Sequence, residues 1–361
     1  MSRPSTGRRL SLEKCEERSM MTAGASVING VLVVEGFDAD STIVISAREN
    51  RAMSFVDYRI GTTGMGIQGS VPKSAISYIQ VNGKGGNDMI LNKTSIPSSL
   101  FGGQGNDVLV GGGGMDILDG GSGNDILFGR QGNDRLNGGV GDNALIGGSA
   151  NDTYQLYSRN SNNRILEEAN RDFDTLDFSK LSASQGVYAN LETGNITSNP
   201  NTLDRLLGKM RATILDGGSS DPSNAAMDIM FDTNFATFDS ITRGSAVRGE
   251  SAIENILGTL GSDTLLGNSR PNTFYGLDGN DDLRGGGESD YIDGGNGADV
   301  IFGNEGNDYL FGGGDGSTDV LLGGGGADTF YQFVYTDHVT KVKRTTGIIM
   351  DLQPSTGDRV I

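Results

Sequence analysis

From Gly102 to Gln155 the chain reads GGQGNDVLV, GGGGMDILD, GGSGNDILF, GRQGNDRLN, GGVGDNALI and GGSANDTYQ, which are six nine-residue units without a gap. A second block runs from Gly258 to Tyr331 and includes one unit of eleven residues at 312–322. An earlier copy, GKGGNDMIL, begins at Gly83. Short fixed periods of this kind are typical of chains that stack one small unit on the next. The repeats therefore predict a solenoid.

Each unit has a glycine-rich half that closes with an acid at the sixth position, followed by three strand-like residues with an apolar one in the middle. Glycine permits the positive φ angles of a tight turn, and side chains along a strand alternate between its faces. The eighth residue of each unit should therefore point into a thin coil made of two units, with a turn on either edge. The eighth-position residues are Leu109, Leu118, Leu127, Leu136, Leu145, Tyr154, Leu265, Phe274, Leu283, Ile292, Ile301, Leu310, Leu321 and Phe330.

Stacking should gather the sixth-position acids into one column on each edge, where bare carboxylates would repel one another. Calcium binds six to eight oxygens from carboxylates and carbonyls, so ions between successive turns would replace repulsion with cross-links. Asn143 and Asn272 occupy the sixth position in two units, and we expect sites there to be weaker or absent. The expected carboxylate ligands are Asp88, Asp107, Asp116, Asp125, Asp134, Asp152, Asp263, Asp281, Asp290, Asp299, Asp308, Asp319 and Asp328.

The composition agrees with a cation-binding protein. The formal net charge is −18, which disfavours nucleic acid or an anionic membrane as a partner because both attract positive surfaces. Glycine contributes 58 of 361 residues and only 35% of residues are hydrophobic. Ordering so many glycines is entropically costly, so we expect calcium to supply stability that a thin core lacks. There is no apolar run of transmembrane length.

Catalysis finds little support in the sequence. The chain has one histidine, His338, and one cysteine, Cys15, so neither a two-histidine metalloprotease motif nor an internal disulfide can form. Residues 64–69 match G-x-G-x-x-G, but no βαβ pattern surrounds them. A glycosidase that works with two carboxylates alone stays open.

The pattern GGxGxDxUx resembles the RTX, or haemolysin-type, calcium-binding repeat over residues 83–155 and 258–331. The resemblance implies an all-β fold of two parallel β-rolls that fold on binding extracellular Ca²⁺. It implies that the sixth-position aspartates are ligands, together with carbonyls of neighbouring glycines such as Gly111, Gly112 and Gly114. The segment Glu16–Met21 resembles the LEPR-XLL-type N-terminal signature of exported bacterial proteins.

We divide the chain into six parts: a targeting segment (1–24), a β-rich N-terminal cap (25–82), a first roll (83–155), a β-rich connector (156–257), a second roll (258–331) and a C-terminal cap or export signal (332–361). In the connector, residues 202–210 have the spacing of a short helix. We interpret Asp172, Asp174 and Asp177 as solvated turn residues rather than ligands.

These observations predict a non-enzymatic, calcium-binding structural or surface-associated protein, exported by a bacterium to the extracellular space or the cell surface. The alternative is an accessory module or a polysaccharide-modifying enzyme of a secreted hydrolase or toxin system, with a cell surface or polysaccharide as its partner. An exposed aromatic strip or an acidic cleft between the rolls would favour the alternative.

Overall fold

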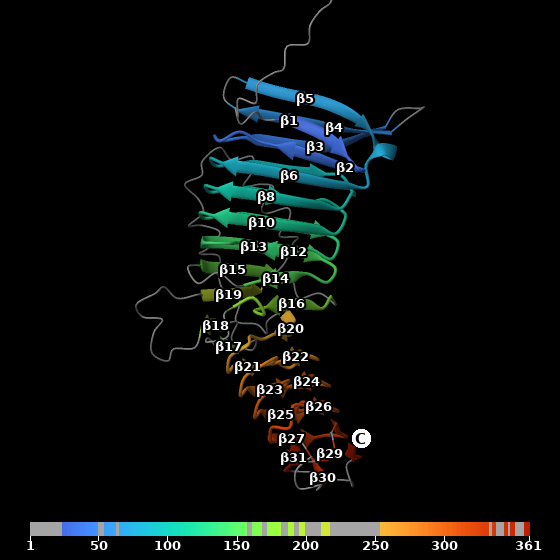
Figure 1. Cartoon of the computed structure of the whole chain (residues 1–361), viewed down its shortest axis with the longest axis vertical. Helices are drawn as coiled ribbons and strands as arrows, with labels where there is room; N and C mark the ends of the chain where they lie inside the picture. Colours follow the sequence, from blue (N-terminus) through green and yellow to red (C-terminus); the bar gives the residue numbers. More distant parts are fainter. Residues whose placement is uncertain are drawn as a thin grey trace, which may run out of the picture.

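The computed structural model describes residues 24–49, 54–62, 65–156, 161–167, 172–181, 187–190, 195–198, 211–216, 253–331, 334–336, 343–345, 347–350 and 357–361. These residues form an elongated stack of coils in which two large sheets run side by side along the molecule (Figure 1). The expected helix at 202–210, the signature at 16–21 and His338 lie outside the described residues. In the described ranges there is no helix with the length and hydropathy needed to cross a bilayer.

Sheet A has 14 strands and is parallel apart from its first pair. In spatial order its strands are β1 (Gly24–Ile28), β2 (Val31–Glu35), β6 (Tyr78–Gly85), β8 (Ser98–Gln104), β10 (Asp116–Ser122), β12 (Arg135–Asn137), β14 (Thr153–Gln155), β16 (Asp174–Asp177), β20 (Ile253–Leu257), β22 (Thr273–Tyr275), β24 (Tyr291–Asp293), β26 (Tyr309–Phe311), β28 (Thr329–Tyr331) and β32 (Arg359–Val360).

Sheet B has 16 strands and interleaves with sheet A along the chain. In spatial order they are β5 (Met65–Pro72), β4 (Ser54–Thr62), β3 (Thr42–Glu49), β7 (Met89–Lys93), β9 (Val108–Val110), β11 (Ile126–Gln131), β13 (Gly141–Ser149), β15 (Ser161–Glu167), β19 (Arg211–Asp216), β18 (Asn195–Ser198), β17 (Val187–Asn190), β21 (Thr264–Leu266), β23 (Asp282–Gly286), β25 (Val300–Glu305), β27 (Asp319–Gly325) and β31 (Gly347–Ile349). A 3₁₀ turn, η1 (Lys73–Ala75), precedes β6, and a small hairpin pairs β29 (Val334–Thr336) with β30 (Lys343–Thr345).

The register confirms that one coil takes two units. Leu118 in β10 pairs with Leu136 in β12, and Leu109 in β9 pairs with Leu127 in β11, so each residue lies beside the one two repeats along. The eleven-residue unit keeps this alignment because its extra residues lie in the turn before β27, where the exposed Asp315 accepts a hydrogen bond from the Ser317 N–H at 2.8 Å. The all-β β-roll predicted from the repeats is confirmed.

The main core consists of two files of eighth-position side chains, one on each sheet, that lie between the two sheets. All fourteen predicted positions, from Leu109 to Phe330, have exposed fractions of 0%. The files continue through residues outside the glycine-rich units, such as Ile165, Leu176 and Ile256, which are also fully buried. Files of this kind work only when each residue stacks on the next coil. A second buried cluster, at seventh and ninth positions around the first block, consists of Leu91, Val108, Val110, Phe128 and Ile146.

The two rolls share both sheets and form one continuous solenoid. In sheet A, β16 of the connector pairs in parallel with β20, which leads directly into the second block. In sheet B, β19, β18 and β17 fill the gap between β15 and β21, with two antiparallel pairs among them. Stacking also begins before the glycine-rich repeats, because β2 pairs with β6 and β3 pairs with β7, both in parallel. At the N-terminal end the antiparallel strands β4 and β5 cover the edge of β3 (Figure 1).

Candidate metal centres

A ladder of hydrogen bonds joins the sixth-position residues on each edge of the solenoid. The N–H of Asp107 donates to Oδ1 of Asp125 at 2.8 Å, and the N–H of Asp116 donates to Oδ1 of Asp134 at 2.7 Å. The same bond recurs between residues two units apart in both blocks, as from Asp281 to Asp299 at 2.9 Å. Stacking of the coils therefore brings the predicted acids together, with one carboxylate oxygen of each engaged.

The second carboxylate oxygen of most of these residues is buried and has no hydrogen-bond partner among the described residues. This is the case for Oδ2 of Asp88, Asp107, Asp125, Asp134, Asp152, Asp174, Asp281, Asp290, Asp299, Asp308, Asp319 and Asp328. Two predicted ligands differ, because Oδ2 of Asp116 accepts the Gly112 N–H and Oδ2 of Asp263 accepts the Thr259 N–H, each at 2.6 Å. The twelve open oxygens are the features that a hard cation would satisfy.

Backbone carbonyls lie beside these open oxygens, next to the first glycine of each unit. A Cβ placed on Gly102 would collide with Oδ2 of Asp107 and lie 2.6 Å from the carbonyl oxygen of Gly120. The equivalent Cβ on Gly120 would meet Oδ2 of Asp125 and lie 2.7 Å from the oxygen of Gly138. The first glycine thus leaves space for a carboxylate and a carbonyl to approach each other. Among the described residues no three Asp, Glu, His or Cys side chains converge on one point, so a cation here would need carbonyl ligands as well as carboxylates.

The carbonyls expected from Gly111, Gly112 and Gly114 lie in the turn before β10. The Gly112 carbonyl accepts a long hydrogen bond of 3.4 Å from the Gln131 N–H, and the Gly112 N–H is held by Asp116. Carbonyls of first-position glycines, such as that of Gly120, lie beside the open carboxylate oxygens. The repeat pattern identifies all of these glycines as candidates, but only the stacked structure shows which of their carbonyls lie next to the open carboxylate oxygens.

Burial makes these carboxylates resist ionisation. It raises the pKa of Asp134 to about 9, of Asp152 to about 8 and of Asp125 to about 7, with further repulsion from acids in the neighbouring coils. Leaving a buried charge uncompensated costs at least several kcal/mol. For twelve such groups the sum would exceed the 5–15 kcal/mol that typically stabilises a folded domain. With ionised acids the stack therefore requires a compensating cation.

The two edges carry different columns, which we name after the strands that follow them. The sheet A column runs from Asp116 to Asp358 and crosses the connector, because the Asp152 N–H donates to Asp174 Oδ1 at 2.8 Å and the Asp174 N–H donates to Glu254 Oε2 at 3.2 Å. Its members are Asp116, Asp134, Asp152, Asp174, Glu254, Asn272, Asp290, Asp308, Asp328 and Asp358. The sheet B column has two separate parts, which are Asp88, Asp107, Asp125, Asn143 and Asn163 in the first, and Asp263, Asp281, Asp299 and Asp319 in the second.

The interpretation of the connector acids as solvated turn residues is wrong for Asp174 and Asp177. Asp174 is 1% exposed and occupies a column position, while Asp177 is 6% exposed. Burial raises the pKa of Asp174 to about 7. Asp172 is half-buried, and its Oδ2 accepts the Ala150 N–H at 2.8 Å. A local signal was present, because Asp174 begins D-T-L-D, the second half of the repeat without its glycines, with Leu176 as the core residue.

Two further acids join the sheet A column by the same shortened pattern. Glu254 begins E-N-I-L and Asp358 begins D-R-V-I, each with an apolar residue in the core or strand position. Arg270 holds Oε1 of Glu254 at 2.8 Å, so a protein cation stands beside that acid. Asp328 donates its N–H to Oδ1 of Asp358 at 3.0 Å, which extends the column into the last coil.

The side-chain amides of the two sixth-position asparagines form hydrogen bonds within the columns. Oδ1 of Asn143 accepts the Asp125 N–H at 2.9 Å, while its Nδ2 donates to Oδ1 of Asn163 at 3.0 Å. Nδ2 of Asn272 donates to the Glu254 carbonyl at 3.0 Å. At these two positions the side-chain Nδ2 donates a hydrogen bond, whereas an aspartate would place an oxygen without a partner there. This geometry agrees with the expectation of weaker or absent sites at both asparagines.

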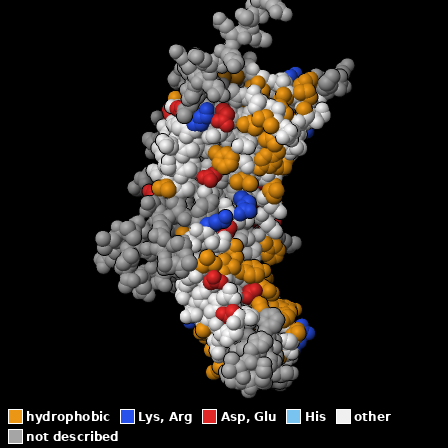
Figure 2. Space-filling model, viewed as in Figure 1, with side chains coloured by type: hydrophobic (Ala, Val, Ile, Leu, Met, Phe, Trp, Pro, Cys, Tyr) orange, Lys and Arg blue, Asp and Glu red, His pale blue; other side chains and the backbone are white. Residues whose placement is uncertain are grey.

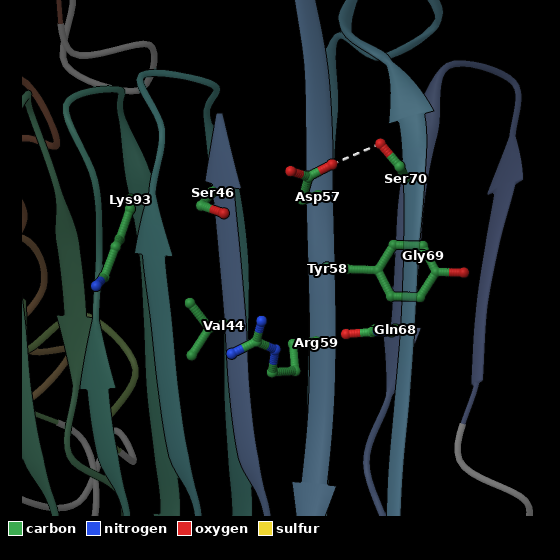
Figure 3. A pocket seen from close by; sticks show the side chains of 9 residues that line it. All are labelled: Val44, Ser46, Asp57, Tyr58, Arg59, Gln68, Gly69, Ser70 and Lys93. Carbon is green, nitrogen blue, oxygen red and sulfur yellow. Dashed lines mark hydrogen bonds between the residues drawn. The ribbon is translucent and has the colours of Figure 1, made fainter. Parts of the chain in front are cut away.

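A shallow groove of about 490 Å³ lies on the outer face of sheet B near its N-terminal end (Figure 3). It is lined by Val44, Ser46, Asp57, Tyr58, Arg59, Gln68, Gly69, Ser70 and Lys93. Its one carboxylate, Asp57, accepts hydrogen bonds from Ser70 and from Arg48, and the bond from Arg48 is the main cause that lowers its pKa. A carboxylate held in this way is a poor proton donor.

Comparison with known proteins agrees with the repeat geometry. The family model of the RTX calcium-binding nonapeptide repeat matches residues 99–127, 119–154, 257–292, 284–318 and 314–331. A search of curated proteins finds no match to this chain. The matched ranges lie in the two glycine-rich blocks and omit the connector that carries Asp174 and Glu254.

Proposed function

Since both glycine-rich blocks are RTX calcium-binding nonapeptide repeats, we propose that this chain is an extracellular, non-enzymatic protein whose solenoid folds when Ca²⁺ enters its two columns. The ions are held by Oδ2 of the column aspartates and by first-position glycine carbonyls such as Gly120 and Gly138. A structural or surface role follows, because the ions set the shape of the whole molecule. RTX repeats are typical of secreted bacterial proteins, which supports the extracellular assignment.

The observation that carries this proposal is the row of twelve buried carboxylate oxygens without partners. Carboxylates and carbonyls are the ligands that calcium prefers. The millimolar Ca²⁺ outside a cell suits modules of about 10⁻⁴–10⁻³ M affinity. Metal binding and folding are then one process, since the site exists only when the coils are stacked.

The proposal gives the chain no catalytic role. The groove near the N-terminal end offers one carboxylate, Asp57, and Arg48 holds it. Glycoside hydrolysis by carboxylates uses a pair with distinct roles. Assay of the full chain for hydrolysis or lyase activity on a polysaccharide panel tests this part, and any turnover that tracks protein concentration contradicts it.

Circular dichroism of the full chain tests the folding part. We expect weak β signal in excess chelator and a cooperative gain of β signal as Ca²⁺ is added, while equilibrium dialysis counts several bound ions per chain. Identical spectra in chelator and in about 10 mM Ca²⁺, above the affinity range of extracellular modules, would exclude coupled folding.

A matched pair of variants tests the ligand assignment. Asp125→Asn keeps the acceptor for the Asp107 N–H but removes an open buried oxygen. Asp282→Asn removes the same charge from an exposed side chain that pairs with Arg284. We expect Asp125→Asn to shift the calcium midpoint to higher concentration and Asp282→Asn to leave it near the wild-type value. Equal shifts would mean that net charge, and not the column, controls binding.

A further inference from the structure

An aromatic strip covers the outer face of sheet A in the second block. Tyr275, Tyr291, Tyr309 and Tyr331 are 40%, 37%, 41% and 37% exposed, and they come from the four consecutive strands β22, β24, β26 and β28. The half-buried Phe311 lies among them, beside Tyr331 with ring centroids 6.4 Å apart. Figure 2 shows hydrophobic side chains gathered on the stretch of the molecule where Figure 1 draws these strands. Exposed aromatic patches of this kind commonly mark binding surfaces.

The repeat register aligns the rings. Tyr291 pairs with Tyr309 at the seventh position, and Phe311 pairs with Tyr331 at the ninth. Seventh and ninth residues point away from the core, because they flank the buried eighth residue on a strand. The rings of Tyr275 and Tyr291 lie 5.8 Å apart across neighbouring strands. The strip thus follows the solenoid axis at the strand spacing of about 4.8 Å.

The first block lacks this strip on the same face of the same sheet. At the seventh and ninth positions β12 has Arg135 and Asn137, and β14 has Thr153 and Gln155. Ile117 in β10 is the exposed apolar residue of that region, at 38%. The fold therefore does not require rings at these positions, since the eighth-position residues are buried in both blocks alike.

The shape of the strip favours a narrow ligand. Four strands of three residues present a face of roughly 190 Å², from strand spacings of about 4.8 Å and a rise of about 3.3 Å per residue. A stable protein interface needs about 800 Å² on each partner. A single extended chain of sugar rings is narrow enough to lie along the strip, and the apolar faces of pyranose rings stack on aromatic side chains much as nucleobases do.

The local charge disfavours an anionic ligand. Asp293 lies between Tyr275 and Phe311 in the ninth-position row. A polyanion laid along the strip would be repelled by this carboxylate. None of the four tyrosine hydroxyls has a hydrogen-bond partner in the part of the chain that the structure describes, so these groups are available to sugar hydroxyls.

From this combination we propose that the aromatic strip of the second block binds an uncharged polysaccharide strand, laid along the solenoid axis over Tyr275, Tyr291, Tyr309 and Tyr331. The proposal adds a partner to the calcium-dependent scaffold proposed above and relies on that scaffold to align the rings. Removing rings should weaken binding by about tenfold each, the size of stacking on a single aromatic side chain.

Affinity electrophoresis of the full chain in Ca²⁺ tests this, with native gels that contain hydroxyethylcellulose or, as the anionic comparison, cellulose sulfate. We expect hydroxyethylcellulose to retard the wild-type chain and cellulose sulfate to leave it unaffected. The variant Tyr291→Thr/Tyr309→Thr should lose the retardation, and threonine suits these strands because Thr273 and Thr329 occupy the same row. Ile117→Ala, on the same face in the first block, should keep it.

Each variant is also followed by circular dichroism during a calcium titration. If the wild-type chain folds with Ca²⁺ but is not retarded by hydroxyethylcellulose, the strip proposal alone is overturned. Retardation by cellulose sulfate overturns the choice of an uncharged ligand. If the tyrosine variant fails to fold, saturation-transfer NMR on the wild-type chain with cellohexaose decides, since absence of transfer from aromatic protons contradicts the proposal. A chain with the same β signal in chelator and Ca²⁺ overturns the folding proposal instead.

Discussion

The two acidic columns of this solenoid have the same chemistry but differ in continuity. The sheet A column crosses the connector through Asp174 and Glu254, because both residues precede strands that stack directly on one another. The sheet B column stops at Asn163, opposite Ala212 of β19, and resumes at Asp263. The difference teaches that glycines are not needed for a column position. An acid followed by a strand with a core residue is sufficient once neighbouring coils hold it in register.

The first prediction separates the two columns of the first block by pH in the absence of calcium. Folded-state pKa values are raised to about 9 for Asp134 and about 8 for Asp152 in the sheet A column, against about 7 for Asp88 and about 6 for Asp107 in the sheet B column. The unfolded value is about 3.9. Because the folded-state pKa values lie above the unfolded one, protonation of these carboxyls stabilises the metal-free fold. This stabilisation is complete below about pH 3.9, the unfolded pKa, and is lost as the pH rises through the folded-state pKa.

In excess chelator we therefore expect β signal to decline as the pH rises from about 4 to about 9, at about 1.4 kcal/mol per group and pH unit. Within the first block, protection of sheet B amides should stop declining near pH 7, while protection of sheet A amides should decline until pH 8–9. Hydrogen exchange at a series of pH values measures both. Equal profiles for the two sheets would contradict the difference in burial.

The second prediction removes the bridge between the blocks. Asp174→Ala deprives the buried Asp152 N–H of its acceptor and removes one open carboxylate oxygen. We expect a loss of at least about 1–3 kcal/mol in the free energy of unfolding, from the unsatisfied donor alone. The single calcium-dependent transition should also split into two, one for each block.

Asn163→Ala is the matched control, because Asn163 ends the first part of the sheet B column and is equally buried, at 1%. It should weaken the first block without splitting the transition. A calcium titration followed by circular dichroism and calorimetry distinguishes the two variants. If Asn163→Ala uncouples the blocks and Asp174→Ala does not, continuity of the sheet A column has no role in coupling.

The third prediction adds an ion to the discontinuous column. Asn143→Asp replaces a donating amide with an oxygen beside Oδ1 of Asn163, which repels it in the metal-free state. We expect about one additional bound calcium per chain, counted by equilibrium dialysis, and a steeper dependence of folding on Ca²⁺. Unchanged stoichiometry together with a destabilised calcium-loaded form would mean that this coil lacks the carbonyls needed to complete a site.

The smallest expected effect concerns the turns, where the two edges should behave alike. In most units the second residue adopts a positive φ, and this includes residues other than glycine, such as Arg130 (81°) before β12 and Leu277 (80°) before β23. Such angles cost other residues roughly 1–2 kcal/mol, partly offset by the greater chain entropy of glycine. Arg130→Gly and Leu277→Gly should each stabilise the calcium-loaded fold by up to about 1 kcal/mol in thermal unfolding. If either substitution destabilises the fold, the original side chain stabilises it by more than the strain of the positive φ costs.

Much of the solenoid could be predicted because the residue types within each unit indicate which side chain is buried and which lies in a column. Apolar eighth residues such as Leu127 and Phe274 are all in the core, and sixth-position aspartates such as Asp125 and Asp281 all lie in the columns. The connector was harder, since Asp174 and Glu254 lie in segments without the glycine signature. Their shortened patterns are common by chance, and only pairing with β14 and β22 gives them a place in the stack.

The sequence by itself determined the coil of two units, the files of core residues, the acidic edges and the need for a cation, because these follow from a strict period and from the geometry of strands and turns. Tertiary structure alone decided three things. It joined the two blocks into one solenoid, it left Oδ2 open in twelve of the column aspartates, and it gathered tyrosines from four separate units into one strip. Each depends on which residues become neighbours across coils, and a period cannot specify this where the chain leaves the repeat.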